Sequence, residues 1–362
     1  MNILLLSRYG KLPPASRYRF FQYIPYLESA GHNVTVHALL DDSYMARQYL
    51  KKAPPVLPLP VIYAKRAASL LRAKQFDLIW LEKEALPWVP AGVEHTLGLA
   101  KAPYVVDYDD ATFHNYDEHR LQLVRSLLGT KVAKLMARAE VVVVGNEYLA
   151  DYARAAGAHE IKFMPTVVDL SRYPKQVSPS GDCDAFTIGW IGSPPNSKHL
   201  SLIGDALSAV CRNIKARLRV VGGWRIDLPQ DVPVEYVPWS EQTEVEELRR
   251  FDVGIMPLYP GNWERGKCGL KLINYMAAGL PTIASGIGVN TEIVEHGTTG
   301  FLAQSDQDWR EALMELAQSH ELRTRMGRAG REKVEKQYCL EIAAPKMAEW
   351  LMRAGQGSAA FA

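Results

Sequence analysis

The sequence has few cysteines, almost no net charge and no long apolar run. Its four cysteines are scattered through 362 residues without a Cys-x-x-Cys pair, which argues against a zinc site and a disulfide framework. A formal net charge of +2 lacks the strongly basic footprint of a protein whose main ligand is nucleic acid. No apolar run is long enough to cross a bilayer, and no secretory signal precedes the first apolar segment. We therefore expect a cytoplasmic protein.

The composition is that of a globular protein of two ordinary domains. Hydrophobic residues make up 48% and charged residues 23% of the chain, both typical of packed soluble folds. A length of 362 residues is enough for two separate cores. In the first half, short apolar runs alternate with helical patterns. The predicted buried strands cover residues 2–7, 34–40, 78–81, 104–107 and 141–145, with a helix predicted over 17–31.

A second alternating series follows a Ser-, Pro- and Gly-rich segment. Strands are predicted at residues 186–191, 218–221, 234–237, 253–257 and 281–284, and helices at 198–213, 241–250, 306–319, 321–337 and 340–353. Alternation of this kind predicts parallel sheets covered by helices on both faces. The predicted fold is α/β, with two tandem Rossmann-like domains facing each other across a cleft. The expected boundaries are 1–170 for the first domain, 171–184 for a linker, 185–338 for the second domain, and 339–362 for a C-terminal helix packing back on the first.

Residues 263–281 carry the clearest functional signal. They join a basic, glycine-containing turn to a helix that we expect to begin near Cys268 and to end at Gly279. Lys267 and Lys271 lie at the positive end of this helix, where a cation is mildly unfavourable and an anion is stabilised. A phosphate would compensate for that placement. The alternative is that both lysines are simply solvated on an exposed first turn.

Several separated segments of the second half together carry a family resemblance. They are residues 189–194 with Lys198, residues 252–258, residues 271–281, and residues 288–294 with Gly297 and residues 300–302. In their order and spacing the sequence resembles the family 4 glycosyltransferases of GT-B fold. The resemblance implies a nucleoside-diphosphate sugar held by the second domain, an acceptor held by the first, and transfer with retention of anomeric configuration. It implies no cofactor besides the donor substrate and no metal.

The resemblance also assigns candidate donor-site residues. Ser193 stands where the family commonly has an arginine after Gly192, while Lys198 keeps the family's lysine. The family's two glutamates would fall at Gly266 and Asn274, so both are missing here. Lys198 and Lys271 are the expected catalytic cations, because charge develops on the leaving diphosphate. The expected donor-binding set is Gly10, Gly192, Ser193, Lys198, Glu264, Lys267, Gly269, Leu270, Lys271 and Asn274.

In the first half, charged residues follow the predicted strands. Asp109 stands where many family members have a histidine near the transferring sugar, and we expect it to act as a third catalytic residue. An Asp-x-Asp metal motif and, for Asp110, an acidic helix start are the competing interpretations. The expected acceptor-binding set is Lys11, Arg17, Arg19, Asp110 and His114, with Glu82 as a weaker candidate.

Together these observations predict a metal-independent, retaining hexosyltransferase that moves a sugar to a hydroxyl of a glycan or lipid-linked acceptor, as in cell-surface polysaccharide synthesis. A sugar-nucleotide epimerase on the same fold and a catalytically degenerate nucleotide-sugar-binding protein remain as alternatives. Contact with the inner face of the membrane is a further expectation, with a solvated helix face as its alternative. It rests on the basic residues Lys51, Lys52, Lys65, Arg66, Arg72 and Lys74.

Overall fold

The computed structural model describes residues 1–50, 52, 59–174 and 184–356. These form two compact units. Unit 1 comprises Met1–Thr166, Gly266–Cys268 and the chain from Leu340 onward, whereas unit 2 comprises Val167–Arg265 and Gly269–Cys339. Most of the predicted linker, residues 175–183, lies outside the described residues.

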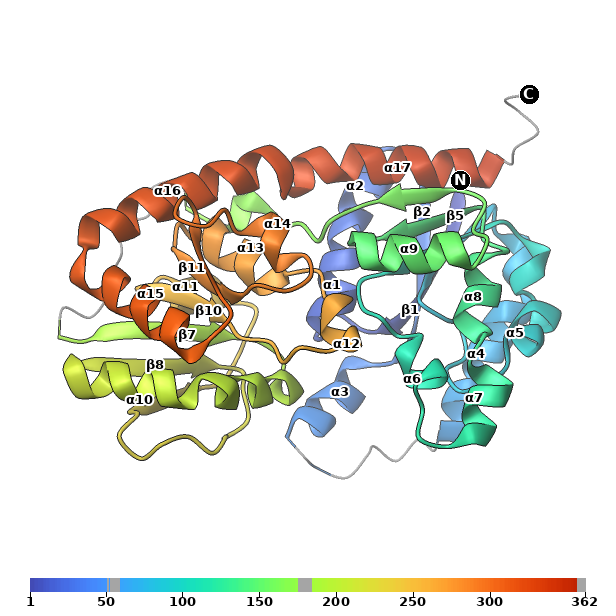
Figure 1. The fold of residues 1–362 in the computed structure, drawn as a ribbon. Helices are drawn as coiled ribbons and strands as arrows, with labels where there is room; N and C mark the ends of the chain where they lie inside the picture. The colour runs from blue at the N-terminus through green and yellow to red at the C-terminus, as the bar shows by residue number, and fades with distance from the viewer. Residues whose placement is uncertain (51, 53–58, 175–183, 357–362) are drawn as a thin grey trace. The chain divides into compact units, whose positions relative to one another are not determined.

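Unit 1 is built on a parallel six-stranded sheet in the order β2-β1-β3-β4-β5-β6. Its strands are apolar almost throughout because both faces of the sheet are covered by helices (Figure 1). The strands are β1 (Asn2–Tyr9), β2 (Asn33–Leu40), β3 (Leu78–Glu82), β4 (Tyr104–Tyr108), β5 (Val141–Val144) and β6 (Ile161–Phe163).

Alternate strand residues of unit 1 point into two different cores. Leu81 and Val106 belong to one core cluster with residues of the helices on one face, while Trp80 of the other face contacts Phe20 and Tyr23, with ring centroids 4.9 and 6.2 Å away. The helices are α1 (Pro14–Arg19), α2 (Ile24–Ser29), α3 (Asp42–Tyr49), α4 (Leu59–Leu71), α5 (Ala91–Leu97), α6 (His114–Asp117), α7 (Gln122–Leu128), α8 (Lys131–Met136), α9 (Glu147–Ala155) and α17 (Leu340–Gln356). Short 3₁₀ segments cover Phe21–Tyr23, Ala73–Gln75 and Leu99–Lys101.

Unit 2 has its own parallel six-stranded sheet, in the order β12-β11-β10-β7-β8-β9. Its strands are β7 (Phe186–Ile191), β8 (Ala216–Val221), β9 (Val234–Val237), β10 (Val253–Met256), β11 (Thr282–Ser285) and β12 (Gly300–Ala303). Its helices are α10 (Gly204–Asn213), α11 (Glu244–Leu248), α12 (Asn262–Arg265), α13 (Leu270–Ala277), α14 (Asn290–Ile293), α15 (Asp306–Gln318) and α16 (His320–Gln337), with 3₁₀ segments at Leu170–Arg172 and Pro194–Ile203.

The predicted fold class is confirmed, since both units are parallel α/β sheets of Rossmann-like type. Two details were wrong. The helix expected over residues 17–31 is broken into α1, a 3₁₀ turn and α2, where Phe20 leaves the helical conformation with φ −132°. The helix expected over 198–213 begins as a 3₁₀ segment and becomes α-helical only at Gly204. The short strands β6 and β12 were not predicted.

The strand orders indicate where each unit has room for a ligand. In a doubly wound sheet, ligands bind at the carboxyl ends of neighbouring strands whose connections run in opposite directions. In unit 1 that point lies between β1 and β3, and in unit 2 between β7 and β10. We call these positions the switch points. Within the described residues, no helix is long and apolar enough to cross a membrane.

Candidate functional site

The switch point of unit 2 brings Gly192 and Lys271 together. Gly192 directly follows β7, and a Cβ placed on it would lie 2.6 Å from Cε of Lys271. The lysine side chain therefore lies across the glycine backbone. Its ammonium is 5.3 Å from the centroid of the Trp190 ring, a cation–π contact. The missing Cβ of Gly192 is what allows a cation to reach the end of β7.

Helix α13 positions Lys271. The structure begins this helix at Leu270, two residues later than predicted, after Gly269 in the left-handed conformation (φ +67°). Glycine adopts that conformation without the steric cost of a Cβ. Lys271 is thus the second residue of the helix, where backbone N–H groups without helical partners and the helix dipole favour an anion.

A histidine–carboxylate pair lies beside the same edge of unit 2. Nε2 of His199 is 3.8 Å from Oε1 of Glu264, and Nδ1 of His199 accepts a hydrogen bond from the backbone N–H of Tyr259 at 3.4 Å. Both side chains are largely shielded from solvent. Glu264 was an expected donor-binding residue, whereas His199, which directly follows the exposed candidate Lys198, was not predicted. Ser193 accepts a hydrogen bond at 2.8 Å from the Asn196 side chain.

Asn274 occupies a buried position in α13. It is 4% exposed, and its Oδ1 accepts a hydrogen bond of 3.2 Å from the hydroxyl of Tyr173. That Asn274 contacts the donor ribose stays a prediction. The buried hydrogen bond with Tyr173 explains why an amide side chain fits this position.

Asp109 and Asp110 are paired with lysines of unit 1. Nζ of Lys83 lies 2.6 Å from Asp109 and 3.7 Å from Asp110. Nζ of Lys267 lies 3.7 Å from Asp110, and the Gly266–Cys268 segment belongs to unit 1. That Lys267 binds the donor stays a prediction. Burial disfavours the charged form of Asp109, but Lys83 and Arg19 outweigh it and hold the pKa of Asp109 below its usual value.

Arg19, an expected acceptor-binding residue, is enclosed within unit 1. The residue is 2% exposed, its guanidinium makes two 2.9 Å hydrogen bonds to Asp107, and it donates at 2.7 Å to the carbonyl of Met164. These contacts hold Arg19 in the interior of unit 1, and its contact with an acceptor stays a prediction. Arg17 is also buried, and its guanidinium packs 4.9 Å from the centroid of Tyr18.

The remaining first-half candidates have local partners. His114 lies 2.9 Å from Asp117 and 2.7 Å from the hydroxyl of Tyr148. The ammonium of Lys11 lies 5.8 Å from the Phe21 ring centroid. Gly10 abuts the carboxylate of Asp42, 2.3 Å from where a Cβ would lie.

Two further expectations concern unit 1: a basic membrane-binding stretch and an Asp-x-Asp metal motif. In the predicted basic membrane stretch, Arg66 is buried and donates to the carbonyls of Ser7 and His37, so it is no surface cation. In the alternative Asp-x-Asp metal motif, the first carboxylate would be Asp107, which forms an ion pair with Arg19. Throughout the described part of the chain, no cluster of three histidine, cysteine or acidic side chains could hold a metal ion.

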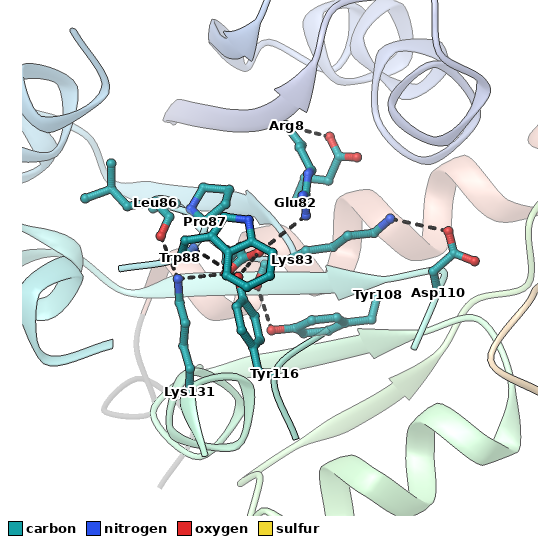
Figure 2. Close-up of polar contacts among 12 residues, drawn as sticks. Arg8, Glu82, Lys83, Leu86, Pro87, Trp88, Tyr108, Asp110, Tyr116 and Lys131 are labelled. Carbon is teal, nitrogen blue, oxygen red and sulfur yellow. Dashed lines mark hydrogen bonds and ion pairs between the residues drawn. The ribbon is translucent and has the colours of Figure 1, made fainter. Parts of the chain in front are cut away.

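A buried ionic network underlies the switch point of unit 1 and was missed entirely (Figure 2). Lys131, whose side chain is fully buried, lies 2.7 Å from both Glu84 and Glu94. Glu84 also accepts hydrogen bonds from Tyr116 and lies 3.3 Å from Arg8 at the end of β1. Burial raises the pKa of Glu94 to about 7, against the opposing effect of Lys131. The only sequence signal was the run of charges directly after the buried strand β3.

Comparison with known proteins finds a family match in the second half of the chain. Residues 185–319, which include Gly192, His199 and Lys271, match the family described as glycosyl transferases group 1. The chain is 25% identical, over 79% of its own length and 79% of the relative, to a GDP-mannose-dependent monoacylated alpha-(1-6)-phosphatidylinositol monomannoside mannosyltransferase of Corynebacterium glutamicum.

Solved structures of similar proteins establish its GT-B fold. HepE of Anabaena, in complex with UDP and glucose, matches with a TM-score of 0.73 at 18% identity, over 97% of this chain and 99% of that one. WaaG, a glycosyltransferase involved in lipopolysaccharide biosynthesis, matches with a TM-score of 0.69 at 15% identity, over 97% and 99%. The chain therefore has the GT-B architecture of two Rossmann-like units.

Proposed function

We propose that this protein is a glycosyltransferase that moves a hexose from a nucleoside-diphosphate sugar to a hydroxyl of a glycan or glycolipid, with retention of configuration. The observation that carries the proposal is Lys271 lying across Gly192 at the switch point of unit 2, one residue inside a helix start. A cation and a helix N-terminus converge there, as a diphosphate requires. HepE of Anabaena has been crystallised with UDP-glucose, which supports a donor of this class.

The chemistry needs electrostatic stabilisation more than a protein nucleophile. Cleavage of the bond between sugar and diphosphate leaves negative charge on the phosphate oxygens as the sugar becomes oxocarbenium-like. Pre-organised cations and N–H groups aimed at that charge lower the barrier. In unit 2, Lys271 and the first turn of α13 supply both. A lysine can do this without a divalent metal, so the proposed reaction is metal-independent.

The proposed acceptor class is based on one relative. The Corynebacterium relative acts, by its name, on a phosphatidylinositol monomannoside, so a glycolipid is the acceptor that we favour. A lipid-linked acceptor and a nucleotide-sugar donor meet at the cytoplasmic face of a membrane, and we propose that location.

The proposal is tested by donor binding followed by turnover. We expect a UDP- or GDP-sugar to raise the melting temperature of the protein, because a ligand of the native state stabilises it. With a glycolipid extract as acceptor, the matching donor should be consumed in the presence of EDTA, and NMR of the product should show the donor's anomeric configuration. Conversion of the donor to its epimer without acceptor would instead identify an epimerase. Donor binding without any turnover would leave a binding protein.

A further inference from the structure

Trp88 is a large aromatic side chain left half-exposed at the switch point of unit 1. It lies in the loop after β3, 50% exposed, on a backbone with φ +62° (Figure 2). Among the described residues, Lys83 in the same loop is the only other non-glycine residue with a positive φ. For residues with a Cβ this conformation is strained and persists only where the surroundings enforce it. Such strain concentrates at functional sites.

Three backbone groups of the loop are fixed by hydrogen bonds from elsewhere in unit 1. The N–H of Trp88 donates to the hydroxyl of Tyr116 at 3.1 Å, and the carbonyl of Pro87 accepts from Tyr63 at 2.8 Å. The carbonyl of Leu86 accepts from the buried ammonium of Lys131 at 2.6 Å. The loop is therefore locked on both sides of the indole.

The charges that lock the loop are costly to bury. Glu84, Glu94 and Lys131 are each at most 2% exposed. Well-packed apolar residues often replace a buried ion pair with no loss of stability. Stability alone therefore does not account for this network. Its effect is to hold one loop conformation, and with it the direction of one exposed ring.

The Trp88 ring itself is supported by two neighbours and remains open to solvent. Tyr116 and His119 pack near-perpendicular to it, each at 74°, with centroids 5.1 and 5.7 Å away. These contacts fix the ring while leaving half its surface exposed. A rigid, amphipathic indole offers contact area with little ordering entropy to lose on binding.

A cation is linked to this ring through one carboxylate. The guanidinium of Arg8 is 3.3 Å from Glu84, and the same carboxylate is hydrogen-bonded to Tyr116, on which Trp88 packs. Trp88 thus follows β3 and Arg8 belongs to β1, the two strands that flank the switch point. A flat apolar ring and a multiple hydrogen-bond donor are coupled through one buried carboxylate.

We propose that Trp88 is the platform on which a pyranose ring of the acceptor stacks, with Arg8 at its rim binding hydroxyl or acidic groups. The inference rests on the proposed transfer to a glycan or glycolipid. The C–H hydrogens on the apolar face of a pyranose carry partial positive charge and complement the negative face of an indole. The hydroxyls at the ring edge then meet the guanidinium, whose five N–H donors suit them.

The test uses simple sugars as probes and no donor. Saturation-transfer NMR would be recorded with methyl α-glucopyranoside, methyl α-mannopyranoside and N-acetylglucosamine. Wild-type protein should transfer saturation to the C–H protons of at least one sugar. Trp88→Gly should abolish the signal, Trp88→Phe should retain part of it, and Tyr26→Ala, which removes another exposed aromatic ring of unit 1, should leave it unchanged. Glycine relieves the positive φ, so the Trp88→Gly protein should fold.

The outcomes separate this inference from the proposed function. An undiminished signal in Trp88→Gly, or no signal from wild-type protein with any of the three sugars, would overturn the platform. Loss of sedimentation with anionic lipid vesicles in Trp88→Gly, with sugar signals intact, would assign the ring to a lipid surface and also overturn it. A sugar signal that depends on Trp88 in a protein that neither binds nor turns over nucleotide sugars would keep the platform and reject the transferase.

Discussion

The two switch points differ in the residues that form them, although both lie at the carboxyl ends of strands in parallel six-stranded sheets. In unit 2, glycine backbone and one lysine from a helix start make the site, and Gly192 and Gly269 allow the close approach. In unit 1, the loops contain buried charges that are already paired, such as Lys83 with Asp109 and Lys131 with Glu84. The difference indicates that unit 2 is suited to bind an added anion, whereas unit 1 is suited to hold side chains in fixed directions.

This contrast has a physical basis. A diphosphate brings its own charge and needs close backbone N–H groups and a cation. A neutral sugar hydroxyl is recognised by direction, which requires donors and rings that do not move. Buried ion pairs provide such rigidity at a cost in stability. The predictions that follow change one side of the comparison at a time.

The largest effect is expected from removing the central cation of unit 1. Lys131→Met would leave Glu84 and Glu94 as buried carboxylates without the ammonium 2.7 Å from each. Breaking a buried pair in this way costs about 3–5 kcal/mol, measured as the free energy of unfolding in urea. Lys134→Met, on the exposed side of the same helix, should change it by less than about 0.5 kcal/mol. Equal values for the two variants would mean that the Lys131 ammonium does not offset the burial of the two carboxylates.

The same network should make stability depend on pH. Burial raises the pKa of Glu94 from 4.5 to about 7. The folded state therefore binds this proton more tightly than the unfolded state does. The free energy of unfolding should fall as pH rises from about 4.5 to 7, by about 3 kcal/mol if the whole shift is expressed.

Glu94→Gln removes this titration and should reduce the slope over that range. A slope of the same sign remains, because burial raises the pKa of Asp107 from 3.8 to about 7 as well. Urea unfolding at several pH values measures it. A slope in Glu94→Gln equal to that of the wild type would show that another group carries the pH dependence.

In unit 2 the expected effect is on the reaction rather than on folding. Lys271→Ala should lower kcat by about two orders of magnitude, as for loss of one oxyanion-stabilising donor. Donor affinity should fall less, because the charge on the diphosphate is greatest in the transition state. Stability should hold, since alanine is a good helix former.

Lys215→Ala is the matched control for that variant. Lys215 is an exposed lysine of unit 2 that directly precedes β8. It lies at the amino ends of the strands, away from the switch point. A wild-type kcat in Lys271→Ala, or an equal loss in both variants, would remove Lys271 from the mechanism.

Gly192→Ala should have a smaller effect through the same lysine. The added methyl group would lie 2.6 Å from Cε of Lys271 and 2.9 Å from the Trp190 ring, so the lysine must move. A displacement that costs about 1.4 kcal/mol weakens donor binding about tenfold, which calorimetric titration with the donor measures. Gly92→Ala adds a methyl group in a helix of unit 1 where nothing lies within 4 Å and should leave donor affinity unchanged. Unchanged affinity in Gly192→Ala would show that Lys271 does not depend on that glycine.

The contrast between the units also explains what the sequence could predict. The buried strands were recognisable because residues such as Leu78–Glu82 and Val141–Val144 are apolar on both faces. Lys271 could be chosen because a helix start is a local feature, whereas Gly192 was assigned by the family resemblance. Short or half-exposed strands such as Ile161–Phe163 carry too weak a pattern.

The network of unit 1 lay beyond sequence reasoning for a different reason. Which charges become buried is decided by tertiary packing. Arg19 looked like a surface cation, yet it is enclosed with Asp107 of β4. Lys131 and Glu94 come from two different helices that meet under one loop. Neither local spacing nor composition distinguishes such residues from solvated ones.

The smallest expected effect tests whether the Trp88 backbone is strained. Trp88→Ala and Trp88→Gly both remove the indole and its contacts with Tyr116 and His119. In the folded state they differ only in the steric cost of a Cβ at φ +62°. Alanine should retain the strain and glycine should relieve it, so the glycine variant should be more stable by about 1 kcal/mol in urea unfolding. At an ordinary loop position the order reverses, because glycine adds entropy to the unfolded chain. A more stable alanine variant would therefore mean that the loop relaxes without its tryptophan, and that the ring itself, rather than the ionic network, holds the backbone in place.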